Sequence, residues 1–250
     1  MRSCLCIDQG NGHCHMGWFE NGTLVRRRSV RNEEAEEVLK CLEGEMTNGI
    51  IYCSVSKEET ALRRQLERLR AGRLVAVGKD TPLPIEVRYS RDEMGGDRVA
   101  AAVGAYKRHK GRNVLVVDLG TAITYDVVTE DGKLEGGNIA PGLQMRLDAL
   151  HERTDRLRRV EVGGEVSLIG RGTEEAIRNG VVNGIEFEIT GYAEELRRRG
   201  AKDLMVILTG GDGKYFEKRM KSKIFAQRKI ELVYEEDLVL EGLNAIIECS

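Results

Sequence analysis

The chain has 250 residues, of which 41% are hydrophobic and 32% are charged, with only three prolines. This apolar content is enough for a packed core, which excludes disordered, collagen-like and coiled-coil proteins. The 39 Lys and Arg residues nearly balance the 41 Asp and Glu residues, so the basic excess that is usual in duplex-binding proteins is missing and no nucleic acid partner is expected. No apolar run approaches 18 residues, and we therefore expect neither a membrane span nor a signal peptide.

The six cysteines do not form a Cys-x-x-Cys motif, and three of them lie in apolar, strand-like runs. Buried free thiols behave as small hydrophobic side chains, and reduced thiols are typical of a cytoplasmic protein. The run His13-Cys14-His15 is a weak candidate for zinc. Adjacent residues on a strand point to opposite faces, so these three side chains are not expected to share one ion.

The first elements in the chain form a predicted meander of three strands. Residues 2–8 make a short apolar strand, residues 14–19 a second strand and residues 23–28 a third. Asn21-Gly22, between the last two, is a strong signal for a tight hairpin turn.

Alternating helices and strands follow the hairpin. Ser56 is expected to begin one helix, with Glu59 in the capping-box position and Leu62, Leu66 and Leu69 on its buried face. The other predicted elements of this half are a helix, two strands and a helix at residues 33–42, 49–54, 74–77 and 97–109.

The same order of elements occurs again later in the chain. Asp118 corresponds to Asp8, and Gly132 corresponds to Gly22, each 110 residues later in the chain. The second copy comprises predicted strands at 114–118, 122–128, 133–136, 204–209 and 230–234 and predicted helices at 173–199, 212–221 and 237–248.

The repeat predicts an α/β protein of two like domains, residues 1–111 and 112–250, each with the order β-β-β-α-β-α-β-α. Each sheet should be mixed, with antiparallel hairpins first and crossovers after them. The second domain carries an insertion near residues 136–170, and we expect a ligand-binding cleft between the domains.

Each copy has an Asp-x-Gly turn directly after its first strand, beginning at Asp8 and at Asp118. Glycines let the backbone approach a phosphate with its N–H groups pointing outward, and an aspartate beside them can hold a cation. A single such motif is more simply a tight turn in which Asp accepts backbone hydrogen bonds. Two copies at equivalent places favour phosphate binding.

These motifs resemble the superfamily of acetate kinase, sugar kinases and actin, and within it the type III pantothenate kinases. The superfamily has two ribonuclease-H-like domains around one nucleotide. The matching blocks, in order, are Asp8-Gln9-Gly10-Asn11, Gly95-Gly96-Asp97-Arg98, Asp118-Leu119-Gly120-Thr121-Ala122, Gly136-Gly137 with Pro141-Gly142, Gly172-Thr173, Thr209-Gly210-Gly211 and Glu241-Gly242-Leu243.

The resemblance implies phosphoryl transfer from ATP to pantothenate, the first step toward coenzyme A. It assigns Asp97 as the base that receives the hydroxyl proton, whereas the spacing alone favours a helix N-cap at this residue. Gly95, Gly96 and Arg98 would contact pantothenate, and Arg98 suits its carboxylate.

Two further residues are expected at pantothenate by the same resemblance. They are Thr173, for which a helix cap is an equally good interpretation, and Tyr89, which precedes the Gly-Gly-Asp-Arg block.

The remaining implied ligands are ATP with Mg²⁺ and a monovalent cation, K⁺ or NH₄⁺, bound by Asp118. A cytoplasmic homodimer is also expected from the resemblance, with the partner closing part of the pantothenate pocket. The residues expected at ATP are Asp8, Gln9, Gly10, Asn11, Gly12, His13, Cys14, His15 and Thr121.

The first motif departs from the family pattern at Gly12, where relatives have Thr or Ser. A second departure is Leu157-Arg158-Arg159, where relatives tend to have proline after the leucine. Two alternatives stay open. One is a regulator that binds nucleotide without turnover, which the departure at Gly12 would fit, and the other is a kinase of the superfamily that acts on a sugar or a carboxylate.

Overall fold

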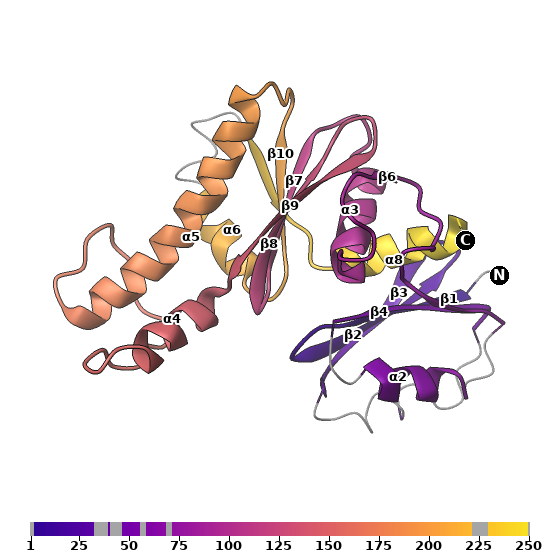
Figure 1. The fold of residues 1–250 in the computed structure, drawn as a ribbon, viewed down its shortest axis with the longest axis horizontal. Coiled ribbons are helices and arrows are strands. Elements are labelled where there is room, and N and C mark those ends of the chain that lie inside the picture. The colour runs from indigo at the N-terminus through magenta and orange to yellow at the C-terminus, as the bar shows by residue number, and fades with distance from the viewer. Residues whose placement is uncertain are drawn as a thin grey trace. The chain divides into compact units, whose positions relative to one another are not determined.

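The computed structural model describes residues 3–32, 40, 47–55, 59–68, 72–221 and 230–249, which form two compact units of mixed α/β structure (Figure 1). Unit 1 contains Met1–Gly111, Glu130–Gly136 and Asp237–Ser250, and unit 2 contains the rest. The C-terminal helix thus belongs to unit 1 together with the first 111 residues. The domain boundaries expected from the repeat, residues 1–111 and 112–250, stay a prediction.

The sheet of unit 1 has the strand order β3-β2-β1-β4-β5. Strand β1 pairs antiparallel with β2 and parallel with β4, and β5 is parallel to β4, so the predicted hairpin-first mixed sheet is confirmed. The strands are β1 Ser3–Gln9, β2 His13–Glu20, β3 Thr23–Arg31, β4 Gly49–Ser54 and β5 Leu74–Ala76.

One face of this sheet is covered by α2, Glu59–Leu66, whose Leu62 and Leu66 pack into a cluster with Leu5 and Ile7 of β1. These two strand residues alternate with residues on the opposite face, as a strand period of two requires. The predicted helix at 33–42 lies outside the described residues apart from residue 40, and Ser56 and Leu69 lie outside them as well.

The opposite face is covered by α3, Gly96–Arg108, and α8, Leu238–Cys249 (Figure 1). These two helices cross closely because each of them has a glycine at the crossing point. A Cβ at Gly242 would overlap the carbonyl oxygen of Ala100, and a Cβ at Gly104 would overlap that of Leu238. Packing at glycines brings α8 into unit 1, a long-range contact that the repeat in the sequence does not contain.

The second sheet has the order β11-β10-β7-β8-β9-β6. Its edge strand β6, Glu86–Val87, pairs with the start of β9 inside unit 1, and this pairing is absent from the sequence prediction. The other strands are β7 Val114–Leu119, β8 Ala122–Val128, β9 Lys133–Pro141, β10 Met205–Thr209 and β11 Glu231–Tyr234.

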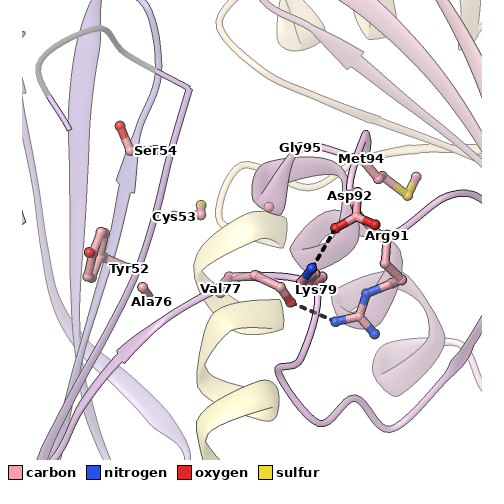
Figure 2. A pocket seen from close by; sticks show the side chains of 12 residues that line it. Tyr52, Cys53, Ser54, Ala76, Val77, Lys79, Arg91, Asp92, Met94 and Gly95 are labelled. Carbon is pink, nitrogen blue, oxygen red and sulfur yellow. Dashed lines mark hydrogen bonds and ion pairs between the residues drawn. The ribbon is translucent and has the colours of Figure 1, made fainter. Parts of the chain in front are cut away.

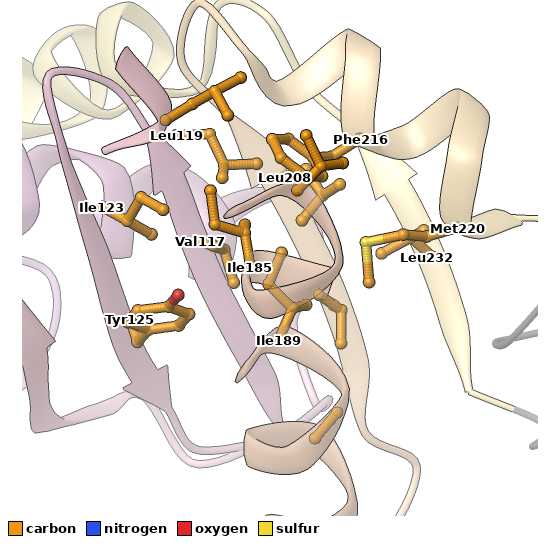
Figure 3. Close-up of a cluster of buried hydrophobic side chains, with 14 of the residues drawn as sticks. Val117, Leu119, Ile123, Tyr125, Ile185, Ile189, Leu208, Phe216, Met220 and Leu232 are labelled. Atoms are coloured by element: carbon orange, nitrogen blue, oxygen red, sulfur yellow. The ribbon is translucent and has the colours of Figure 1, made fainter. Parts of the chain in front are cut away.

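The core of unit 2 lies between its strands and the long helix α5, Thr173–Arg198, with α6, Gly213–Met220, beside it (Figure 3). Val117, Leu208 and Ile185 are fully buried there. The insertion contains a further helix, α4 at Leu143–Glu152, that the sequence analysis did not identify. None of the helices that the structure describes has the length and apolar character needed to span a membrane.

Candidate functional site

Asp8 lies near the end of β1, at the centre of the unit 1 sheet. In register it faces His15 on β2 and Cys53 on β4. Its Oδ1 accepts a hydrogen bond from the Cys53 thiol, with a Sγ–Oδ1 distance of 3.4 Å. Gln9 points to the other face, where its Oε1 accepts a hydrogen bond from the Ser54 hydroxyl at 2.8 Å.

The loop after Asp8 is held by backbone contacts. The Gly10 amide donates to the His13 carbonyl at 2.9 Å, and the Asn32 side-chain amide donates to the Gly10 carbonyl at 2.7 Å. Gly12 has no atom within 4 Å of the position that a Cβ would occupy, and its φ lies outside the left-handed region. Neither the backbone conformation nor the packing therefore requires a glycine at position 12.

His13, Cys14 and His15 alternate across β2 as expected. Both histidines are exposed and their rings stack with centroids 6.0 Å apart, whereas Cys14 is buried. In the described part of the chain no group of three His, Cys, Asp or Glu side chains is arranged to hold a metal ion.

Asp97 lies in the first turn of α3, and one of its carboxylate oxygens, Oδ1, accepts a hydrogen bond from the Arg98 amide at 2.8 Å. The N-cap residue is Gly95, so the alternative interpretation of Asp97 as the helix N-cap is wrong. The two glycines before it are needed for space: a Cβ at Gly95 would overlap Oδ1 of Asp97, and one at Gly96 would lie 2.8 Å from the Cβ of Cys53.

The carboxylates of Asp8 and Asp97 lie close enough to interact electrostatically. The pKa of Asp8 is raised from 3.8 to about 7, mainly by burial and in part by the negative charge of Asp97, while the hydrogen bond from Cys53 acts in the opposite direction. Burial, followed by these two carboxylates, also raises the pKa of the Cys53 thiol. Two carboxylates that repel one another at the end of a strand are a suitable pair for a bound cation.

Tyr89 and Arg98 are brought together by β6 and α3. The guanidinium carbon of Arg98 lies 5.3 Å from the centroid of the Tyr89 ring, and Arg98 is buried. Tyr89 also packs on Gly136, where a Cβ would lie 3.1 Å from its ring. Tyr89 thus lies beside the Gly-Gly-Asp-Arg block, as the resemblance implies.

A pocket of about 270 Å³ opens beside this block (Figure 2). Cys53 and Gly96 form part of its wall, and Lys79, Arg91 and Asp92 line its other side. Lys79 pairs with Asp92 at 3.3 Å.

Unit 2 holds the second Asp-x-Gly turn. Asp118, near the end of β7, lies against Gly210, whose φ of +81° places it in the left-handed region and whose Cβ, if present, would overlap the Asp118 carboxylate. Thr121 is exposed, and its carbonyl accepts a hydrogen bond from the Gly142 amide at 3.1 Å. The Asp212 amide donates to the Leu119 carbonyl at 3.0 Å, so the turn at 118–121 lies against the turn at 209–212.

Comparison with known proteins decides the family of this chain. The family described as type III pantothenate kinase matches residues 4–195. The type III pantothenate kinase of Phocaeicola vulgatus is 40% identical over 97% of each chain, and that of Bacteroides fragilis is 38% identical over 97% of this chain and 96% of its own. The chain belongs to the type III pantothenate kinase family.

Solved structures agree on the fold of this pantothenate kinase family member. A Campylobacter jejuni protein described as a Baf family transcriptional activator superposes with a TM-score of 0.61 at 22% identity, covering 98% of this chain and 97% of its own. A Sinorhizobium meliloti protein described as a 2-dehydro-3-deoxygalactonokinase gives 0.59 at 14% identity, covering 98% of each chain. These likenesses concern the fold, and they agree with the predicted architecture of two ribonuclease-H-like domains.

Thr173 of the kinase begins α5 and is exposed, while Gly172 is the N-cap residue and no side chain caps the helix. The alternative of a Thr173 cap is therefore wrong.

Two site residues are missing from the sequence analysis. Cys53 is recognisable only from the pairing of β1 with β4. Asp212 at the start of α6 has a raised pKa because it is partly buried.

Proposed function

We propose that the chain transfers the γ-phosphoryl group of ATP to the primary hydroxyl of pantothenate, giving 4′-phosphopantothenate, the first step of coenzyme A biosynthesis. The observation that carries this proposal is the carboxylate of Asp97 at the start of α3, next to Asp8, in a chain of this family. A carboxylate close to a second carboxylate that can hold a cation is the arrangement that phosphoryl transfer needs.

Asp97 orients the pantothenate hydroxyl and receives its proton. The amide of Arg98 fixes Oδ1, and Oδ2 accepts no hydrogen bond from the described residues, so it is available to the substrate hydroxyl. In a loose phosphoryl-transfer transition state the proton moves late, and a weak base such as a carboxylate is sufficient.

Mg²⁺ fits the donors that unit 1 provides. The oxygens of Asp8 are hard ligands, and the negative charge of Asp97 close to this partly buried carboxyl favours a cation beside it. Asp8 would hold the ion, which would supply positive charge to the phosphate oxygens.

Pantothenate is bound, in this proposal, by Gly95, Gly96 and Arg98 with Tyr89 and Thr173. The Tyr89 ring packs by the Arg98 guanidinium and restricts it, which suits a bidentate contact to the substrate carboxylate. Thr173 is exposed on unit 2 and has a hydroxyl that makes no cap.

ATP is bound by the two glycine turns. In the first, the residues proposed to contact ATP are Asp8 to His15, with the Gly10 amide used inside the loop, and in the second Thr121 has an exposed side chain with a hydroxyl. Asp118 would bind K⁺ or NH₄⁺, so activity should be higher with these ions than with Na⁺.

A homodimer is proposed from exposed apolar side chains in unit 2. Asn179 and Asn183 of α5 donate to Ser167, which places the loop with Leu168 and Ile169 along this helix, and Phe187 lies one turn further on. The exposed fractions of Leu168, Ile169 and Phe187 are 72%, 73% and 56%. Such a patch is typical of a protein interface, and a second copy would bury it. The free thiols fit the proposed cytoplasmic location.

The proposal is tested by measuring ADP release from the purified protein with pantothenate and, in parallel, with a panel of sugars and small carboxylates. Turnover with pantothenate alone supports the proposal. Turnover with a panel member instead, or nucleotide binding with no turnover, would favour one of the two alternative functions.

A further inference from the structure

Cys53 lies beside Asp8 and close enough to Asp97 to interact with it electrostatically. Its thiol donates to Oδ1 of Asp8, and its Cβ touches the first residue of α3, because a Cβ at Gly96 would lie 2.8 Å from it. This side chain is 2% exposed. It therefore contacts both the strand that carries Asp8 and the helix that carries Asp97.

The thiol is also the one hydrogen-bond donor to the Asp8 carboxylate among the described residues. Neighbouring main-chain groups are used elsewhere: the Val55 amide donates to the Gln9 carbonyl at 3.0 Å, and the Gly10 amide donates to the His13 carbonyl. A largely buried carboxylate with a single donor depends on that donor for its orientation.

We infer that Cys53 is a positioning residue, which holds Oδ1 of Asp8 toward the sheet and leaves Oδ2 to the magnesium of the nucleotide. This inference rests on the proposed function only in naming the nucleotide as the ligand. A thiol is a weak donor, so a hydroxyl at the same place serves equally well and a methyl group does not.

A matched control exists on the same strand face. Cys6 precedes Asp8 by two residues on β1, is fully buried, and lies 3.8 Å from the sulfur of Cys4 rather than beside a carboxylate. Replacing Cys6 removes a buried thiol of the same sheet without touching Asp8.

The experiment compares Cys53→Ala, Cys53→Ser, Cys6→Ala and Cys6→Ser by calorimetric titration with the magnesium complex of a non-hydrolysable ATP analogue, with thermal unfolding measured alongside. Cys53→Ala should weaken binding about three- to tenfold, because the Asp8 carboxylate loses the donor that fixes its orientation. Cys53→Ser should stay within twofold of the wild type, and both Cys6 variants should bind as the wild type does.

Three results would overturn the inference. These are a folded Cys53→Ala that binds as tightly as the wild type, a Cys53→Ser that binds as weakly as Cys53→Ala, and a Cys6→Ala that weakens binding to the same degree. If Cys53→Ala fails to fold, Cys53→Ser is compared with Cys6→Ser. A side chain that only fills space predicts that both serine variants lose binding equally, or that neither loses binding and Cys53→Ser folds no better than Cys53→Ala. Either result would overturn the inference. The readout is binding, so a wild type that binds the analogue but leaves pantothenate unchanged contradicts the proposed function alone.

Discussion

Gly12 stands where relatives have Thr or Ser, and the structure shows that a side chain can be accommodated at this position. The position has room for a side chain and an ordinary φ. A threonine hydroxyl there could donate to a phosphate oxygen, and it would also reduce the freedom of the loop before binding. Gly12→Thr should therefore lower the Michaelis constant for ATP about three- to tenfold, while that for pantothenate stays the same.

Steady-state kinetics with each substrate varied in turn measure this effect. Gly10→Thr is a useful comparison, because a Cβ there would lie 3.5 Å from the His13 carbonyl oxygen in a tighter part of the loop. An unchanged or higher constant for ATP in Gly12→Thr would show that the missing hydroxyl is not what limits binding.

Asp8 gives a prediction about pH. Its pKa is raised from 3.8 to about 7, so its contribution to stability is greatest below pH 4 and is lost as the pH rises through 7. Without Mg²⁺, Asp8→Asn should stabilise the protein by about 1–3 kcal/mol at pH 8 and by less at pH 5.

Thermal unfolding in EDTA at the two pH values measures the gain. Asp80→Asn removes an exposed carboxylate of the same unit and controls for the change of net charge. A gain that is equal at both pH values, or equal to that of Asp80→Asn, would contradict the electrostatic cause.

Helices and turns that are set by neighbouring residues are predicted well from the sequence, whereas a strand that depends on a distant partner is not. Asn21 and Gly22 both have positive φ, +50° and +81°, as the predicted hairpin requires, and the predicted helix at 173–199 is observed at Thr173–Arg198. These features are set by neighbouring residues. The two-residue strand β6 is formed only by pairing with β9, 47 residues later, and no local pattern announces it.

The same argument explains what could be predicted of the site. Asp8, Asp97 and Asp118 belong to glycine motifs that the sequence displays. The structure explains the two glycines before Asp97, where a Cβ would lie too close to Asp97 or to Cys53, whereas Gly10 and Gly120 have only ordinary contacts at the Cβ position. Cys53 depends on the register of two parallel strands that are far apart in the chain. A residue of this kind becomes visible only when the strands are paired.

The crossing of α3 and α8 makes a prediction about stability. A Cβ at Gly242 would overlap the Ala100 carbonyl oxygen, so Gly242→Ala must push the helices apart, at a cost of about 2–4 kcal/mol in the free energy of unfolding. Gly191→Ala, at an exposed position in α5 with open space around it, should instead stabilise by up to about 1 kcal/mol. Denaturant unfolding measures both, and equal effects would contradict the close crossing.

For the whole molecule, the proposed dimer predicts a species of twice 27.9 kDa in equilibrium sedimentation. Leu168→Glu with Phe187→Glu should shift it to the monomer and reduce turnover, because charge at an interface core opposes association. Val25→Glu changes an equally exposed apolar residue on β3 and should leave the dimer intact. A wild type that is fully active as a monomer would end this part of the account.

The central claim is that Asp97 serves the transfer of phosphate to pantothenate, and one measurement tests it most directly. Initial rates of 4′-phosphopantothenate formation are compared for the wild type and Asp97→Asn at saturating MgATP, with unfolding temperature and binding of the ATP analogue as controls. General-base contributions predict a loss of about 10²–10⁴-fold in rate with folding and nucleotide binding retained. The claim predicts a loss of rate of at least about 10²-fold, so an Asp97→Asn protein that keeps more than about a third of the wild-type rate would contradict it.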